Sequence, residues 1–255
     1  MGKSAKSVPW TRSVGLALQL VAIAGALSWG WSVWAGSEGP RGRAAEQVLG
    51  VETSLITPAA SAQAMITPAV SISARIDPNW LDAVSSRSGI PRAALAAYAG
   101  AASVLAEQSP RCHLGWNTLA AIGHIESDDE RHGGTVVSDN GYSSVPIIGP
   151  KLDGGPFAGI HDSDGGVWDG DMVWDHAVGP FQFIPQTWRT WGADGNGDGQ
   201  ADPNQMDDAA LTAARYLCHA GDMSTVDGWR RAVLSYNHSE SYVDDVAKLA
   251  NSYHS

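Results

Sequence analysis

The sequence has few basic residues. Its 255 residues contain 16 Lys and Arg against 27 Asp and Glu, which gives a formal net charge of -11. This balance argues against nucleic acid as a partner, because phosphate binding needs a basic surface. The length allows one large domain or two small ones with a real core, and the acidity by itself identifies no partner.

Charge is absent from residues 14–35, a run long enough to span a bilayer. Basic residues precede the run and place the N-terminus in the cytoplasm, and tryptophans near its far end suit the outer interface of the membrane. We expect residues 1–36 to be an uncleaved signal anchor that fixes the chain to the cell membrane by one transmembrane helix. Cleavage at residues 33–35 is the alternative and would give a secreted protein. No cysteine lies near the run, which excludes a lipoprotein, and everything after residue 36 then lies outside the cytoplasm.

Cysteine is also scarce, since Cys112 and Cys218 are the two in the chain. In an exported protein an even pair is most simply a disulfide, and two buried free thiols are the alternative. A bond that closes a loop of roughly 100 residues stabilises the fold by about 4 to 5 kcal/mol in the chain-entropy model. The pairing predicts that the helix after Cys112 is tied to the helix that ends near Cys218.

The remaining chain divides by composition. Residues 37–76 are rich in Ala, Ser, Thr and Pro and indicate a flexible linker. Helical patterns begin at Asp77-Pro78 and fill most of residues 77–255, which we expect to form one domain. Residues 127–178 interrupt these patterns with an irregular excursion rich in Gly and Asp. The predicted domain is mainly α, with any strands confined to this excursion.

A lone glutamate ends the apolar stripe of residues 114–126. Trp116, Leu119, Ile122 and Glu126 follow helical spacing and share one face. A carboxyl group held half out of water at a helix C-terminus, where the dipole disfavours negative charge, keeps its proton near neutral pH. Glu126 is therefore a candidate general acid. The alternative is that the helix has ended and residues 127–130 are its solvated exit.

A second motif is typical of a calcium loop. Oxygen ligands occupy its first, third and fifth positions and a glycine the sixth, but Gln205 stands where the standard loop has an acid. A lengthened loop could close on an acid further along. The expected ligands are Asp194, Asn196, Asp198, the backbone carbonyl of Gln200, and Asp208. The alternative is a plain turn of Asn, Asp and Gly.

Aromatic and amide side chains complete the candidate site. Trp168 and Trp174 lie among aspartates, as in walls that stack on sugar rings, although two tryptophans anchoring a solvated loop would give the same pattern. Gln182 is the one polar side chain within the apolar run around 179–185, and a buried amide needs partners or a ligand. Tyr236 and Asn237 follow at the end of an amphipathic helix.

The order of these motifs resembles the lysozyme-like lytic murein transglycosylases, in particular the membrane-bound lytic transglycosylase B family, over roughly residues 79–250. The resemblance rests on Ile-Glu-Ser at 125–127, Gly-Pro-Phe-Gln-Phe-Ile-Pro at 179–185, the calcium loop and the Tyr-Asn pair. It implies a lysozyme-like transglycosylase domain with a Gly/Asp-rich insertion, an EF-hand-like loop whose fifteenth residue is the last ligand, and one N-terminal transmembrane helix. The chain departs from the family between 127 and 178, so substrate subsites do not carry over there.

The resemblance also implies the residue roles. Glu126 would be the catalytic acid, and the substrate-binding residues would be Ser127, Trp174, Gln182, Tyr236 and Asn237, with Tyr236 bonding near Glu126. Lytic transglycosylases are taken to cleave the bond from N-acetylmuramic acid to N-acetylglucosamine without water and to leave 1,6-anhydromuramic ends. We also expect a structural Ca²⁺ and peptidoglycan strands as the substrate. The protein is expected to be a membrane-anchored monomer that remodels the cell wall.

Two alternatives remain open at this point. A hydrolytic muramidase would cleave the same bond with Glu126 and a second carboxylate, for which Asp128, Asp164 and Asp175 are candidates. A membrane-tethered wall-binding protein that has lost activity is the other alternative, and the joint presence of Glu126, Gln182 and Tyr236 argues against it.

Overall fold

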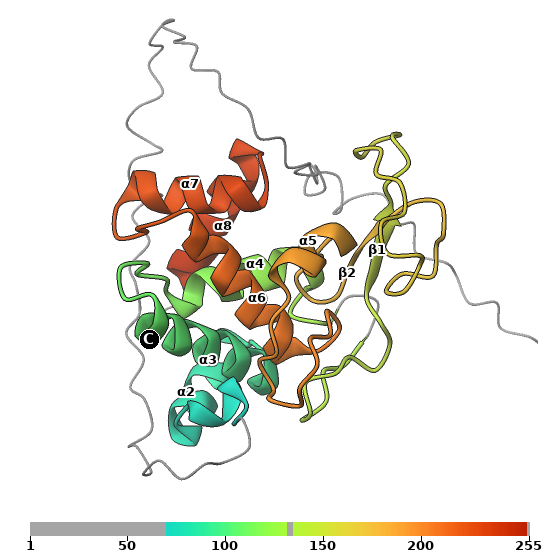
Figure 1. The fold of residues 1–255 in the computed structure, drawn as a ribbon. Coiled ribbons are helices and arrows are strands. Elements are labelled where there is room, and N and C mark those ends of the chain that lie inside the picture. Colours follow the sequence, from blue (N-terminus) through green and yellow to red (C-terminus); the bar gives the residue numbers. More distant parts are fainter. Residues whose placement is uncertain (1–69, 132–134, 254–255) are drawn as a thin grey trace, which may run out of the picture.

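The computed structural model describes residues 70–131 and 135–253, which form a helical body with an irregular lobe on one side (Figure 1). The predicted anchor and residues 37–69 of the predicted linker lie outside the described residues. Within the described part, no single helix has the length and apolar composition needed to cross a membrane.

Seven α-helices and one short 3-10 helix make up the body in the described ranges. They are η1 (Ile72–Arg75), α2 (Pro78–Ser88), α3 (Arg92–Gln108), α4 (Trp116–Ser127), α5 (Pro185–Trp191), α6 (Met206–His219), α7 (Val226–Tyr236) and α8 (Glu240–Ser252). The prediction of a mainly α domain is confirmed.

Local sequence sets the start of the domain. The Asp77 carboxylate accepts 2.9 Å hydrogen bonds from the backbone N–H groups of Asn79 and Trp80, and Pro78 occupies the first turn of α2. The helix ends at Gly89, whose φ of 73° a residue with a side chain would adopt only at a cost. The Asp77 cap and Pro78 are the helix-start signals that the sequence carries at 77–78.

Helix α3 is the centre of the core. Eleven of its 17 residues are buried, and it packs against α6, α4 and η1. Its small residues allow close approach: a Cβ on Gly100 would lie 2.4 Å from the carbonyl oxygen of Ile72. The segment 72–75, predicted as part of a flexible linker, is therefore folded onto α3. The sequence pattern missed this because the contact is made by backbone against a glycine.

The disulfide between Cys112 and Cys218 is present, as predicted. It joins the loop before α4 to the last turn of α6, and the backbone N–H of Met223 donates to the carbonyl of Cys112 beside it. Helix α4 then packs against α3 on one side and α8 on another. The bond thus fixes the start of the helix that carries Glu126.

The excursion forms the lobe at the right of Figure 1. It holds the two strands of the described residues, β1 (Ile148–Lys151) and β2 (His176–Val178), which pair antiparallel with Ile148 opposite Val178. Strands are therefore confined to this region, as predicted. Inside the lobe, Leu152 is fully buried and its backbone bonds to Asp175 and Ile160.

Candidate active site

Glu126 lies in the last turn of α4 and is partly exposed. Its Oε1 accepts a 2.7 Å hydrogen bond from the hydroxyl of Tyr242 on α8. Burial raises the pKa of Glu126 to about 7, and the Tyr242 hydrogen bond opposes that rise. Since burial is the larger effect, the carboxyl is protonated in a substantial fraction of molecules at neutral pH.

Tyr236 lies close to Glu126 but bonds elsewhere. Burial, followed by the Glu126 charge, raises its pKa well above 10. Its hydroxyl donates to the backbone carbonyl of Phe181 at 2.5 Å. We expected Tyr236 to hydrogen-bond near Glu126; its partner is the Phe181 carbonyl, and the hydroxyl that donates to Glu126 itself is that of Tyr242. Sequence reasoning missed Tyr242 because nothing in an amphipathic helix marks which aromatic residue faces a carboxylate from another helix.

Gln182 occupies a tight turn between β2 and α5. It has a φ of 48°, it is 6% exposed, and its Nε2 donates a 2.9 Å hydrogen bond to the carbonyl of Gly179. Backbone bonds between Val178 and Phe183 close the turn. The amide thus holds its own loop in shape, and Tyr236 holds the same loop through Phe181.

Asn237 and Ser127 are both buried at helix ends. Asn237 follows α7, is 1% exposed, and its Oδ1 accepts from the backbone N–H of Ser239 at 3.2 Å. The Ser127 hydroxyl donates to the carbonyl of Gly123 and accepts from the N–H of Glu130, both at 3.1 Å. Each side chain stabilises backbone beside the candidate site.

The two tryptophans of the lobe differ in surroundings. Trp168 packs against the hydrophobic core. Trp174 is partly exposed and stacks on His161, with ring centroids 4.3 Å apart and planes 17° from parallel. This stacked pair offers an aromatic surface in the lobe, and His161 was not among the predicted residues.

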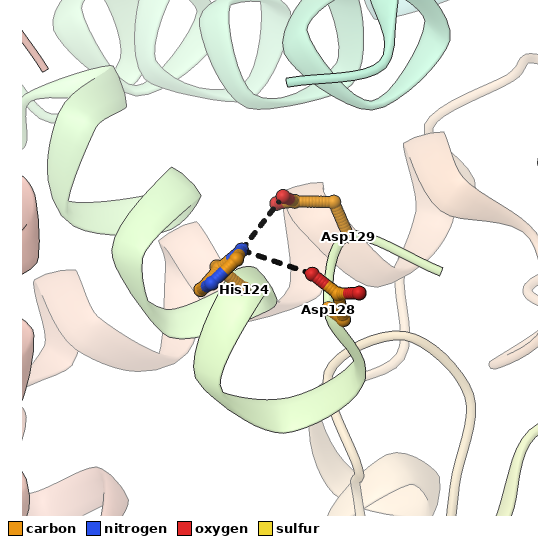
Figure 2. Close-up of side chains that lie close together, drawn as sticks. All are labelled: His124, Asp128 and Asp129. Atoms are coloured by element: carbon orange, nitrogen blue, oxygen red, sulfur yellow. Dashed lines mark hydrogen bonds and ion pairs between the residues drawn. The ribbon is translucent and has the colours of Figure 1, made fainter. Parts of the chain in front are cut away.

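Helix α4 ends in a left-handed turn. Asp128, Asp129 and Glu130 have φ of 54°, 53° and 66°. Each such non-glycine residue costs about 1 to 2 kcal/mol, so the surrounding contacts must compensate for it. Figure 2 shows Asp128 and Asp129 turned toward the His124 imidazole. Ser127, Asp129 and Glu130 are buried by this turn, whereas Asp128 is exposed, so the solvated exit that was the alternative in the sequence describes Asp128 alone.

Glu130 is fully buried at the end of this turn. Neither carboxylate oxygen makes a hydrogen bond of normal geometry with the described residues. Burial raises the pKa of the Glu130 carboxyl to about 8, against the opposing effect of Ser143. A buried carboxyl of this kind is stable in its protonated form, and no sequence signal distinguished it from its acidic neighbours.

The predicted calcium loop is folded as a series of turns closed by Asp208. The Asp208 carboxylate is fully buried and accepts from the backbone N–H groups of Gly195, Asn196 and Asp202 at 2.7, 3.0 and 2.9 Å. Burial raises its pKa to about 6, and the charge of Asp194 adds to the rise. The loop thus brings the negative charges of Asp194 and Asp208 near each other, while Asp208 already accepts from three backbone N–H groups.

The loop also holds the start of the domain. The Ser71 and Ser73 hydroxyls donate to the two carboxylate oxygens of Asp207, and the Ile72 N–H donates to the Gly195 carbonyl at 2.9 Å. Asp207 and Gly195 both belong to the loop region. The conformation of this loop and the position of η1 against the domain therefore depend on the same hydrogen bonds.

Two groups of titratable side chains in the described ranges have ligand atoms within 4.8 Å of one another, His124–Asp128–Asp129 and Asp162–Asp164–Asp175. Asp194, Asp198 and Asp208 do not form such a group. In the second group, Asp175 is fully buried and its oxygens accept from the N–H and hydroxyl of Ser163 at 2.8 and 2.7 Å.

A cavity of about 810 Å³ lies between the N-terminal helices and the loop of residues 194–208. Ser71, Ser73 and Arg92 line one side, and Asn140, Asp198 and Asp207 contribute to the other. Glu126 does not line it, so its volume is no measure of the candidate catalytic groove.

Comparison with known proteins gives one family. The sequence model of the Transglycosylase SLT domain matches residues 168–233, a stretch that includes Gln182, the predicted calcium loop and most of α7. The match supports the resemblance to lytic transglycosylases of the lysozyme-like SLT superfamily, and it does not distinguish the B family within it. Neither the comparison with curated proteins nor that with solved structures found a match.

Proposed function

We propose that the protein is a peptidoglycan lytic transglycosylase whose acid and base are both Glu126. The observation that carries the proposal is the Glu126 carboxyl itself, with a pKa raised to about 7 by burial and one oxygen held by Tyr242. A single group can first give up a proton and then accept one only if its pKa lies near the working pH. The SLT family match supports the substrate class.

The reaction follows from that carboxyl. Protonated Glu126 gives its proton to the glycosidic oxygen, the bond to N-acetylglucosamine breaks, and the N-acetyl group of the muramic residue assists departure. The Glu126 carboxylate then takes the proton of the C6 hydroxyl, whose oxygen attacks the anomeric carbon. The product carries a 1,6-anhydromuramic end, no water is consumed, and Glu126 is protonated again.

The state of the other carboxylates supports this route over hydrolysis. Asp175 is buried and held by Ser163, and Asp164 accepts from the backbone N–H groups of Gly166 and Trp168. Asp128 is exposed and pairs with Arg131 at 3.0 Å. All three candidate second carboxylates are thus engaged in their own turns, whereas an inverting or retaining hydrolase needs one free to face the sugar.

Substrate binding is assigned to the surroundings of Glu126. In this proposal Gln182, Ser127, Asn237 and Tyr236 shape the backbone against which the sugar lies, since each bonds a neighbouring turn or helix end. Trp174, stacked on His161, provides an aromatic face for a pyranose ring. Tyr242 orients the acid.

Calcium and the membrane complete the proposal. Asp194, Asn196, Asp198, Gln200 and Asp208 would hold a structural Ca²⁺, supported by the repulsion between Asp194 and Asp208. The ion would neutralise that repulsion and so stabilise the loop. An N-terminal anchor at residues 1–36 would keep a monomeric enzyme beside the wall that it remodels.

Product analysis tests the function. Purified full-length protein is incubated with peptidoglycan sacculi, and the soluble fragments are identified by mass spectrometry. Anhydromuramic ends are expected, and Glu126→Gln should release none above background. Reducing ends would instead establish the muramidase, and the absence of any fragments would overturn both enzymatic functions.

A further inference from the structure

The end of α4 holds a strained backbone close to the proposed acid. Three successive residues other than glycine, Asp128 to Glu130, are left-handed, and the first of them comes two residues after Glu126. L side chains rarely adopt this conformation, and it persists only where the surrounding structure holds it. Backbone strain of this kind is concentrated at functional sites, so we expect this turn to have a role beside Glu126.

The turn returns the Asp129 carboxylate to the helix that the chain has just left. Its Oδ2 lies 3.0 Å from His124 Nδ1, and its Oδ1 accepts a 3.0 Å hydrogen bond from the hydroxyl of Tyr98 on α3. The Asp129 N–H also donates to the Gly123 carbonyl at 3.3 Å. Asp129 is 1% exposed and Tyr98 is fully buried, so the bond between them forms where water does not compete. The last turn of α4 is thereby fastened to α3.

The guanidinium of Arg131 favours a hydrogen-bonded cluster over a metal site at His124, Asp128 and Asp129. A histidine with two carboxylates is also a ligand set for a metal. The Arg131 guanidinium, however, already donates to Asp128 Oδ1 at 3.0 Å and to Asp129 Oδ2 at 3.3 Å. Arg131 thus supplies a positive charge to both carboxylates, and Figure 2 shows the same two carboxylates paired with His124. We call this hydrogen-bonded cluster of His124, Asp128, Asp129 and Arg131 the clamp.

The clamp and the Glu126 carboxyl lie on opposite sides of the last turn of α4. Residues two apart on a helix point in different directions, so His124 faces Asp129 while Glu126 faces Tyr242. We propose that Asp129 is a positioning residue for Glu126: by fastening the last turn of α4 to Tyr98, it holds the Glu126 carboxyl within reach of Tyr242. This rests on the proposed role of Glu126 as the acid. The charged groups that face His124 are Asp128, Asp129 and Arg131.

Asp129→Asn tests the proposal, because it keeps the size of the side chain and removes its charge. We expect kcat to fall about tenfold or more with KM changed by less than about twofold, since a displaced acid affects the chemical step. The pH at which activity declines on the alkaline side should move down toward the ordinary range of a glutamate, because a loosened Glu126 is better hydrated. Tyr98→Phe, which keeps the ring in the core, should shift both quantities in the same direction by less.

A second aspartate–histidine pair provides a matched control. Asp222 holds His113 through a 2.8 Å contact between Oδ1 and Nδ1, and both side chains are exposed. Asp222→Asn should leave kcat and the pH profile unchanged. A merely structural role for Asp129 would lower the melting temperature and leave kcat per folded molecule and the pH profile as in the parent.

NMR titration of the Glu126 carboxyl separates this inference from the proposed function, because it needs no turnover. If the parent protein releases no fragments, the proposed function fails, and a lowered titration midpoint in Asp129→Asn would still establish the positioning role. An unchanged midpoint and unchanged kcat in folded Asp129→Asn would overturn it. If that variant does not fold, the same two measurements on Tyr98→Phe decide the question.

Discussion

Tyr242 of α8 donates a 2.7 Å hydrogen bond to Glu126 of α4, across 116 residues of sequence. The tyrosine is 3% exposed, and its pKa is raised well above 10 by burial and then by the Glu126 charge. It therefore remains protonated, and a hydrogen-bond donor, at neutral pH. A buried donor of fixed protonation holds the acid in one orientation and favours its ionised form.

Removing the Tyr242 hydroxyl should move the pH dependence of activity upward. Because this hydrogen bond lowers the pKa of Glu126, Tyr242→Phe should raise that pKa above 7 and carry the alkaline decline of activity to higher pH. We also expect kcat to fall about tenfold through lost orientation. Tyr216→Phe is the control, since that hydroxyl bonds the Ser235 carbonyl. An unchanged pH profile in Tyr242→Phe would contradict the assigned contact.

The Glu126 carboxyl should destabilise the fold at alkaline pH. Its pKa rises from 4.5 to about 7 on folding, so the stability that its protonated form contributes is full below 4.5 and is lost as pH rises through 7. At pH 8 we expect Glu126→Gln to be more stable than the parent by about 2 kcal/mol, allowing for partial exposure of the group. Denaturant unfolding at pH 4 and pH 8 measures the difference, which should vanish at the lower value.

Glu130→Gln should also be more stable than the parent at alkaline pH, and the difference should develop over a wider pH range. Its pKa rises from 4.5 to about 8, so its contribution is present below 4.5 and lost as pH rises through 8. The double variant with Glu126→Gln should therefore show the flattest stability profile between these values. A profile as steep as that of the parent would show that both carboxyls ionise without cost in the folded protein.

Calcium should stabilise the domain through the loop of residues 194–208. With free Ca²⁺ at about 100 times its dissociation constant, binding to the folded state alone contributes about 2.7 kcal/mol. The melting temperature should rise with Ca²⁺ and fall with a chelator, and both Asp194→Ala and Asp208→Asn should remove the response. Asp162→Asn, in the Asx turn of the excursion, is the control. A response lost in that variant instead would assign the ion to the excursion.

Reduction of the disulfide should lower stability more than activity. Cys112 and Cys218 are 106 residues apart, and a cross-link of this span contributes about 4 to 5 kcal/mol in the chain-entropy model. Denaturant unfolding of the double Cys→Ser variant should show this loss, while kcat of the folded fraction stays near that of the parent. A reductant should have no further effect on the double variant, which controls for reduction elsewhere in the assay.

Several features of the fold were predictable from local sequence. Asp77 and Pro78 begin a helix because their capping chemistry involves adjacent residues. The apolar stripe that ends in Glu126 predicted a half-buried acid because helical spacing fixes which residues share a face. The cysteine pair and the separate helical and Gly/Asp-rich regions followed from composition. The helix features depend on interactions between residues close in the chain, and the disulfide was predictable because the chain has two cysteines.

The contacts that give Glu126 its chemistry were decided by tertiary structure. The hydroxyl that reaches it comes from Tyr242 rather than Tyr236, because the approach of α8 to α4 sets which tyrosine has the right distance and angle. Asp129 and Glu130 resemble their acidic neighbours in sequence, and only the left-handed turn buries them. The sequence determined that an acid would end a buried helical face; packing of distant helices determined which groups hold it, since hydrogen bonds and desolvation depend on positions in space.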